Sequence, residues 1–496
     1  MLDSLRDTLL ARVYDVAIET PLRRAPKLSA KLNHEIYLKR EDLQPVHSFK
    51  IRGAYNMISR LSDEEKSRGI IAASAGNHAQ GVALSAQKLG ISALIIMPRT
   101  TPEIKVEAVR GYGAEVELHG DSYSEAAAYC KQRAEQTGRV FVHPFDDPLV
   151  IAGQGTIGRE ILEQLPQATH IFVPIGGGGL IAGIAQFVKE LNPAIKVIGV
   201  EPTDSNAMQA SLRADKVVEL PHVGIFADGV AVKRVGDNTF KLVRQYVDDV
   251  ITVSTDQMCA AIKAIFEDTR SIVEPSGALA VAGATNYKLP ADAQVVCVCS
   301  GANVTFERLN QIAERTLIGS GKEAVFAVTM PEKPGALRTF CTDVVNGHNI
   351  SEFNYRLNKR EAAQVMVGVN ISSDADKKAI MKKMAAHGYE HVDLSNDDLT
   401  KEHIRHMVGG RPADSTNEQI YEITFPERPG ALGDFLDAIG NKWNISLFHY
   451  RSAASDQGSV LIGFETTSPA QLEHSLTHAS FEWRHPDSLA LKLFSQ

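Results

Sequence analysis

Residues 69–98, GIIAASAGNHAQGVALSAQKLGISALIIMP, decide the fold class of this chain. An apolar run at 69–76 is followed by a helical pattern at 78–90 and by a second apolar run at 91–98. The same alternation continues to about residue 316 with TPEIKVEAVRGYG, AEVELHG, HIFVPIGGGG, KVIGVEP and AQVVCVCSG. Nearly continuous Val/Ile runs separated by helices are typical of parallel strands covered by helices on both faces. The sequence therefore predicts an α/β fold that binds ligands at the carboxyl ends of its strands.

The bulk composition is that of an ordinary globular protein. The chain has 496 residues, of which 44% are hydrophobic and 23% charged, and this length allows two to four domains. A formal net charge of -8 without a Lys/Arg run argues against a nucleic-acid partner. Neither a signal peptide nor an apolar stretch long enough for a membrane span is expected. The five cysteines form no CxxC pair, which predicts reduced thiols and a cytoplasmic location.

The last third of the chain contains an internal repeat. Three pairs of segments match at one offset of 95 residues: PEKPGAL (331–337) with PERPGAL (426–432), EFNYR (352–356) with LFHYR (447–451), and VMVGV (365–369) with VLIGF (460–464). A constant offset indicates duplication. Each copy predicts a strand, a turn at Pro334–Gly335 or Pro429–Gly430, a helix, two strands and a second helix. We therefore expect a catalytic part at 1–320 and two α+β modules at 324–400 and 419–496.

The segment HSFKIRGA, residues 47–54, places Lys50 between Phe49 and Ile51. Two interpretations are open. A lysine can lay its stem on apolar surface while its ammonium stays in water. Alternatively, a partly buried lysine has a lowered pKa, and its amine can then bond a carbonyl carbon.

Two glycine-containing loops follow predicted strands and open helices. SAGNHAQG (74–81) offers backbone N–H groups to an anion, and the four glycines of VPIGGGGL (173–180) let the backbone wrap a phosphate. For the first loop, a plain helix N-cap by Ser74 or Asn77 is the alternative. For the second, Gly177-x-Gly179-x-x-Ala182 also fits a dinucleotide fingerprint, with Glu201 further on, so a nicotinamide oxidoreductase stays open.

Two further polar residues stand at predicted loop positions. Ser300 follows the apolar run VVCVC, where its hydroxyl meets the ligand cleft or caps the next helix. Glu274, in SIVEPSGA, precedes an apolar helix and is interpreted as a first-turn acid unless the site uses it.

The motifs HSFKIRGA, SAGNHAQG, GGGGL, EPSGA and CSGAN, in this order, resemble the fold-type II pyridoxal phosphate (PLP) enzymes, which are tryptophan synthase β-like. The match is strongest with the threonine/serine dehydratase branch, and the repeat resembles the paired ACT-like regulatory modules of biosynthetic threonine dehydratases. This resemblance implies a Schiff base on Lys50, with Phe49 against the cofactor ring, Asn77 on its 3′ oxygen and Ser300 on its pyridine nitrogen. It also implies that the cofactor phosphate is bound by Gly176, Gly177, Gly178, Gly179 and Leu180, and the substrate carboxylate by Ser74, Ala75, Gly76, Asn77 and His78. No metal ion is assigned.

The resemblance further implies an activity and its regulation. The activity is dehydration and deamination of L-threonine to 2-oxobutanoate and ammonia, the entry to isoleucine biosynthesis, with Lys50 as the base at Cα and L-serine left open as a substrate. The repeat implies effector sites at Tyr355 and Tyr450 for isoleucine as inhibitor and valine as activator, and the family implies a homotetramer. Two alternatives stay open: a sister enzyme such as serine racemase, a catabolic dehydratase, threonine synthase or a cysteine synthase, and a ligand sensor with an inert catalytic half.

Overall fold

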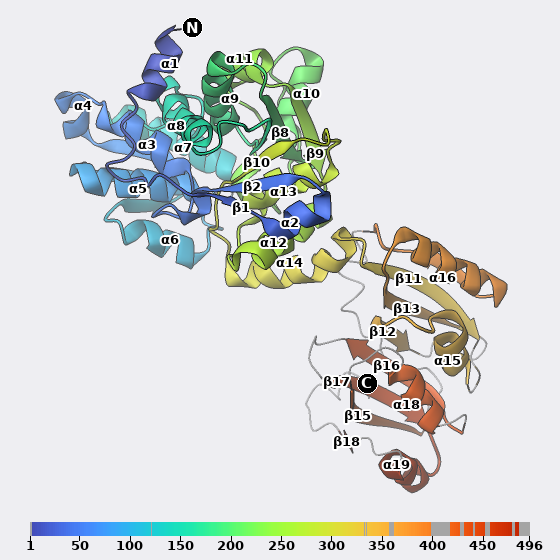
Figure 1. Ribbon diagram of the computed structural model, residues 1–496. Helices are drawn as coiled ribbons and strands as arrows, with labels where there is room; N and C mark the ends of the chain where they lie inside the picture. The colour runs from blue at the N-terminus through green and yellow to red at the C-terminus, as the bar shows by residue number, and fades with distance from the viewer. Residues whose placement is uncertain are drawn as a thin grey trace. The chain divides into compact units, whose positions relative to one another are not determined.

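The computed structural model describes the chain apart from residues 1, 121, 332, 334, 357–361, 398–416, 427–430, 440–441, 452–456, 479–481 and 486–496. The chain folds into two compact units, Met1–Thr316 and Leu317–Gln496 (Figure 1). The predicted turn at Pro429–Gly430 and the residue Pro334 lie outside the described residues.

The first unit contains a smaller sheet of parallel strands in the order β5-β4-β3-β6. Its strands are β3 (Ile70–Ala73), β4 (Ala93–Met97), β5 (Glu115–Leu118) and β6 (Val140–Phe141). β3 and β4 are buried along their whole length, which explains why both read as uninterrupted apolar runs. The helices of this region are α3 (Lys50–Ser59), α4 (Asp63–Arg68), α5 (Asn77–Leu89), α6 (Glu103–Arg110) and α7 (Tyr123–Thr137).

The larger sheet of the first unit has the strand order β1-β2-β10-β7-β8-β9. Only β1 runs antiparallel to its neighbour, so the fold has the parallel sheets and helical cover that the sequence predicts. The strands are β1 (Leu22–Arg24), β2 (Glu35–Arg40), β7 (His170–Pro174), β8 (Lys196–Pro202), β9 (Asp249–Val253) and β10 (Gln294–Cys299). The helices are α1 (Leu2–Leu9), α2 (Pro26–Leu32), α8 (Pro148–Gln164), α9 (Gly179–Leu191), α10 (Ala207–Ala214), α11 (Asp237–Tyr246), α12 (Thr255–Thr269), α13 (Pro275–Asn286) and α14 (Phe306–Gly319), with short 3₁₀ turns at Glu41–Leu43 and Asp228–Val230.

A buried ion cluster of Lys39, Glu41, Arg52 and Glu160 ties β2, α3 and α8 together. Arg52 Nη2 lies 2.8 Å from Glu41 Oε1, and its Nη1 lies 2.5 Å from Glu160 Oε1. Lys39 Nζ lies 2.6 Å from the second oxygen of Glu160, and all four side chains are at most 1% exposed. The cluster balances two cations with two anions, which is the arrangement that buried charge requires. Since Arg52 stands in α3 two residues after Lys50, the cluster fixes the helix that begins with Lys50.

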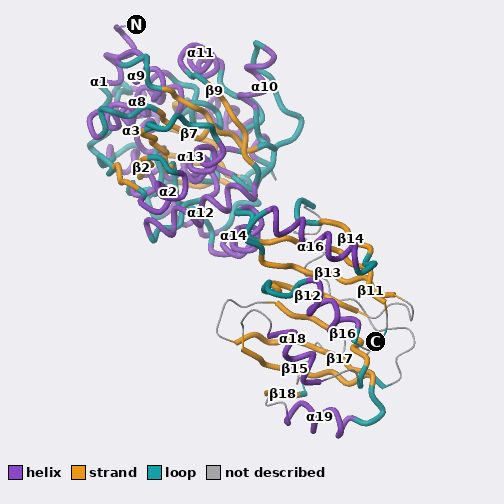
Figure 2. The backbone as a smooth tube through the Cα atoms, turned by 45° about the vertical axis from the view of Figure 1, so that its right-hand side comes forward, coloured by secondary structure: helices purple, strands orange, loops and turns teal. Residues whose placement is uncertain are grey.

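The second unit is one eight-stranded antiparallel sheet in the order β14-β11-β13-β12-β16-β17-β15-β18 (Figure 2). The first module supplies β11 (Glu323–Pro331), β12 (Ile350–Arg356), β13 (Ala362–Asn370) and β14 (Glu390–Asp393), with α15 (Ala336–Thr339) and α16 (Asp374–Ala386). The second supplies β15 (Glu418–Pro426), β16 (Asn444–Arg451), β17 (Gln457–Glu465) and β18 (Glu482–Arg484), with α18 (Ala431–Ile439) and α19 (Pro469–His478). Each module thus has a fourth strand that was not among the expected elements. The helix predicted after Gly335 is short, because it continues as a π-helical turn at Phe340–Val344.

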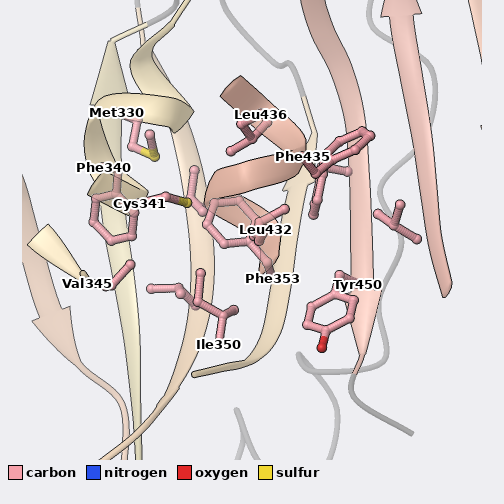
Figure 3. Close-up of a cluster of buried hydrophobic side chains, with 14 of the residues drawn as sticks. Met330, Phe340, Cys341, Val345, Ile350, Phe353, Leu432, Phe435, Leu436 and Tyr450 are labelled. Atoms are coloured by element: carbon pink, nitrogen blue, oxygen red, sulfur yellow. The ribbon is translucent and has the colours of Figure 1, made fainter. Parts of the chain in front are cut away.

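The two modules are joined through β12 and β16 with an approximate two-fold symmetry. Asn354 pairs with His449, and these two positions are themselves 95 residues apart. The flanking pairs, Glu352 with Arg451 and Arg356 with Leu447, exchange when the repeat offset is applied. The modules also share one hydrophobic core, in which Phe353 of the first lies among Leu432 and Phe435 of the second (Figure 3). The duplicated modules therefore fold as one unit.

Candidate active site

Lys50 begins α3 at the edge of the larger sheet. The backbone around it is tied to the end of β10, because Phe49 N donates to the Ser300 carbonyl at 3.2 Å and Ser48 pairs with Gly301. The Lys50 amine donates to the carbonyl oxygen of Pro144 at 3.2 Å. Burial lowers the pKa of Lys50 from 10.5 to about 8, although the carboxylate of Glu274 opposes this shift. A lysine held in this way keeps an appreciable neutral fraction near neutral pH, as a nucleophile or base needs.

Gly176, Gly177, Gly178 and Gly179 link β7 to α9 and have little room for side chains. A Cβ at Gly177 would lie 2.2 Å from the ring of Phe145, and one at Gly179 would lie 2.7 Å from the Phe145 carbonyl oxygen. Gly178 also has a φ of +97°, a conformation that favours glycine. The loop therefore brings bare backbone to the N-terminus of α9, where N–H groups without helical partners bind phosphate.

The loop from His143 to Asp147 connects the glycine loop to Lys50, and no sequence motif singled it out. Pro144 accepts the hydrogen bond from Lys50, and the ring of Phe145 lies over Gly177. The carboxylate of Asp146 accepts hydrogen bonds from the first backbone N–H groups of α11. The residues of the His143–Asp147 loop form no recognisable motif. Only the fold reveals that this loop adjoins the site.

The loop after β3 is organised by Asn77 and His78. The residue before α5 is Gly76, which has no side chain to cap the helix, so the interpretation of Ser74 or Asn77 as an N-cap was wrong. Instead, Asn77 Nδ2 donates to Glu274 Oε1 at 2.7 Å. His78 Nε2 lies 2.9 Å from the Val142 carbonyl, and burial lowers the pKa of His78 to about 3, so its imidazole is neutral at physiological pH.

Ser300 directly follows β10 and is buried, with its hydroxyl donating to the Ser276 carbonyl at 3.3 Å. The next helix begins only at Phe306, so Ser300 is not its cap. Glu274 precedes α13, but its carboxylate does not cap the backbone N–H groups of that helix. Burial raises the pKa of Glu274, and its hydrogen bonds to Asn77 and Ser276 act in the opposite direction. The sequence marked both residues but did not indicate that Glu274 reaches Asn77.

The site therefore joins a desolvated amine, a bare glycine loop, an amide and a buried hydroxyl from separate segments of the first unit. An amine that bonds an aldehyde and a cradle for a phosphate are the two features that PLP requires of a protein. In the part of the chain that the structure describes, no helix is both long and apolar enough to cross a membrane.

Comparisons with known proteins agree with this geometry. Residues 13–301 match the family model described as "Pyridoxal-phosphate dependent enzyme". Residues 314–404 and 409–485 match the model described as "C-terminal regulatory domain of Threonine dehydratase". The nicotinamide alternative was therefore wrong.

The curated relatives match along nearly the whole chain. The biosynthetic L-threonine dehydratase of Burkholderia multivorans is 52% identical over 487 residues, which cover 97% of this chain and 94% of that protein. The enzyme of the same name from Escherichia coli is 50% identical over 93% of this chain and 90% of that protein.

Solved structures resemble somewhat less than two thirds of the chain. The processed form of threonine deaminase isoform 2 from Solanum lycopersicum matches with a TM-score of 0.62 and 49% identity, covering 63% of this chain and 87% of that one. Maize serine racemase matches with a TM-score of 0.59 and 37% identity, covering 64% of this chain and 97% of that one. The two dehydratases match along both units, since they cover 97% and 93% of this chain. The chain therefore belongs to the pyridoxal-phosphate-dependent enzymes and, among them, to the family of biosynthetic threonine dehydratases.

Proposed function

We propose that this protein is a PLP-dependent threonine ammonia-lyase, which converts L-threonine to 2-oxobutanoate and ammonia in the first step of isoleucine biosynthesis. The observation that carries the proposal is the Lys50 amine, held at the Pro144 carbonyl beside a glycine loop without room for side chains. When bound, PLP supplies an aldehyde that bonds amines and an electron-poor ring that acidifies the α-proton of an amino acid.

The residues that the resemblance identifies have proposed roles in binding or proton transfer. Lys50 carries the cofactor and then takes the Cα proton of the substrate, and its lowered pKa keeps a fraction of the amine free to accept a proton. Phe49 would lie against the cofactor ring, and Asn77 would donate to the ring oxygen. Ser300 would offer a hydroxyl, rather than a carboxylate, to the ring nitrogen. A hydroxyl would not hold an additional proton on that nitrogen. The other binding residues act through their backbone and polar groups: Gly176, Gly177, Gly178, Gly179 and Leu180 on the cofactor phosphate, and Ser74, Ala75, Gly76, Asn77 and His78 on the substrate carboxylate.

A coupled assay for 2-oxo acids on the purified protein tests the activity. We expect 2-oxo acid from L-threonine, with a smaller or comparable signal from L-serine, and visible absorbance from the bound cofactor. L-Isoleucine should suppress the reaction, and L-valine should restore it. Absence of 2-oxo acid from both substrates, in protein that carries the cofactor, would contradict the proposed activity.

We also propose that the second unit binds these effectors in a cavity between its two modules. The cavity is lined by Tyr355 and Lys333 of the first module, by Leu436 and Trp443 of the second, and by Met330, Pro331, Gly335, Ala336, Leu337, Arg338, Phe353, Val365, Ile439, Asn444 and Ile445. An apolar wall beside exposed cationic side chains suits a free amino acid with an aliphatic side chain, because the cations attract its carboxylate. Tyr450 takes the matching place in the second module, but it is buried in the shared core and does not line this cavity.

Substitution of Tyr355 should weaken inhibition while sparing catalysis. We expect Tyr355→Ala to raise the isoleucine concentration for half-inhibition by at least ~10-fold, because a large amphipathic side chain leaves the cavity wall. Tyr450→Phe tests the matched position, since alanine there would open a hole in the core. Turnover without effector should stay within about two-fold of wild type in both. Val392→Ala, on the exposed face of β14, is the control. Unchanged inhibition in both tyrosine variants would remove the two residues from the effector sites.

The division into parts follows from this assignment. We propose that residues 1–320 form the catalytic part, and that 324–400 and 419–496 form the two effector-binding modules. We further propose that the enzyme works in the cytoplasm as a homotetramer, as the reduced cysteines and the family resemblance lead us to expect.

A further inference from the structure

Glu274 is a buried carboxylate at the candidate active site, and the proposed function leaves its role open. Its side chain is 3% exposed. Oε1 accepts hydrogen bonds from Asn77 Nδ2 and Ser276 Oγ, both at 2.7 Å, and Oε2 accepts one from the backbone N–H of Asn303 at 3.0 Å. All three partners are donors, so the carboxylate is satisfied only as an acceptor.

Two glycines leave room for this carboxylate. A Cβ at Gly301 would lie 2.7 Å from Glu274 Oε1, and a Cβ at Gly229 would lie 3.2 Å from the same oxygen. A Cβ at Gly301 would also lie 3.3 Å from Asn77 Nδ2. The absence of a side chain at Gly301 thus leaves the space in which the Glu274 carboxylate and the Asn77 amide meet.

The hydrogen bonds also determine which way the Asn77 amide points. Asn303 Nδ2 donates to the Val46 carbonyl at 2.8 Å and to Asn77 Oδ1 at 2.6 Å. A carbonyl can only accept, so the orientation of the Asn303 amide is set by Val46. The oxygen of Asn77 is thereby directed to Asn303 and its nitrogen to Glu274. The hydrogen bond to Glu274 uses one N–H of Asn77, so the second N–H can serve another partner.

We propose that Glu274 is a positioning residue, which holds the Asn77 amide so that a nitrogen donor, and not the carbonyl oxygen, faces the ring oxygen of the cofactor. This inference rests on the proposed function, because it takes the ring oxygen as the partner of Asn77. An N–H donor at that place stabilises the ring oxygen as an anion, whereas a carbonyl oxygen would repel it.

Glutamine at position 274 cannot reproduce this arrangement. If its oxygen takes the place of Oε1, its NH₂ group faces the N–H of Asn303. If it is turned the other way, its NH₂ group faces that of Asn77. One donor–donor contact results in either orientation, and reversal of the Asn77 amide relieves it only by creating another contact with Asn303.

The test is the dissociation constant for PLP of cofactor-free protein, measured for Glu274→Gln in the wild-type and in the Asn77→Ala background. We expect this constant to rise roughly 10- to 100-fold in the wild-type background. In the Asn77→Ala background the same change should alter it by less than about three-fold, because Glu274 acts through Asn77. Asp268→Asn is the matched control. The Asp268 carboxylate is likewise an acceptor, because it accepts hydrogen bonds from the backbone N–H groups of Lys27 and Leu28. This substitution should leave the dissociation constant for PLP unchanged.

An equal loss of affinity in both backgrounds would overturn the inference, because Glu274 would then act independently of Asn77. No loss in the wild-type background would overturn it as well. If Glu274→Gln does not fold, Glu274→Asp withdraws the carboxylate from Asn77 by one carbon–carbon bond, about 1.5 Å, and is judged by the same two criteria. Failure of the proposed function is distinct, because wild-type protein would then bind no PLP or would form no 2-oxo acid.

Discussion

Lys50→Ala is expected to remove the visible absorbance of the bound cofactor and to lower threonine turnover by at least ~10⁴-fold. Two functions are lost together, since the same amine holds the cofactor and accepts the Cα proton. The burial that lowers the pKa of Lys50 to about 8 serves both, because each requires an unprotonated amine. Absorbance spectra and the 2-oxo acid assay on the purified variant measure the two effects separately.

Lys50→Arg is the informative control for that result. Arginine retains a long side chain and a donor for the Pro144 carbonyl, but it stays protonated in proteins and can neither bond an aldehyde nor take a proton. It should therefore fold like wild type and be as inactive as alanine. Wild-type absorbance in Lys50→Ala, or substantial turnover in Lys50→Arg, would show that another residue carries the cofactor.

Arg52→Met is expected to lower the free energy of unfolding of the first unit by about 3–5 kcal/mol, because it leaves buried carboxylates without a full complement of cations. Arg52 is bonded to Glu41 and Glu160, and only Lys39 would remain to balance them. Methionine keeps an apolar side chain of similar length, so most of the expected effect is electrostatic. Urea titration measures it.

The two units supply separate signals for this titration. Both tryptophans, Trp443 and Trp483, lie in the second unit, whereas the visible absorbance of the cofactor reports on the first. The urea midpoint for loss of cofactor absorbance should fall, and the midpoint for tryptophan fluorescence should not. Arg24→Met is the control, since the side chains of its ion pair with Glu35 are 49% and 39% exposed, and such an exposed pair should contribute little to stability. Equal shifts of the urea midpoint for cofactor absorbance from both substitutions would mean that the buried ion cluster contributes no more to stability than the exposed ion pair.

The sequence predicted the parallel sheets well where strands are apolar on both faces, as β3 and β4 are. It did not predict β2, whose segment EIYLKR ends in Lys39 and Arg40. Both side chains are buried, because Lys39 is paired with Glu160 and Arg40 with Asp42. Ion pairing of buried charged side chains hides a buried strand from any argument based on hydrophobic pattern alone.

The same limit applies to the site. A motif marks residues that are neighbours in one segment. Lys50 and its neighbours form one such segment, and the four glycines form another. The bond between Asn77 and Glu274 joins positions 197 residues apart, and nothing in either segment points to the other. Pro144 and Phe145 were missed for a related reason, since the role of Pro144 depends on a backbone carbonyl and not on its residue type.

The pairing of β12 with β16 makes the second unit equivalent to a homodimer built within one chain. In a true homodimer each half would dissociate on dilution, and every substitution would fall on both halves. A covalent link instead keeps the second half at a high effective concentration whatever the protein concentration. It also allows the halves to diverge independently: the position of Arg338, which pairs with Asp437 beside the cavity, is occupied in the other copy by Gly433. A duplicated chain can thus evolve two different binding sites, whereas a homodimer must keep two identical ones.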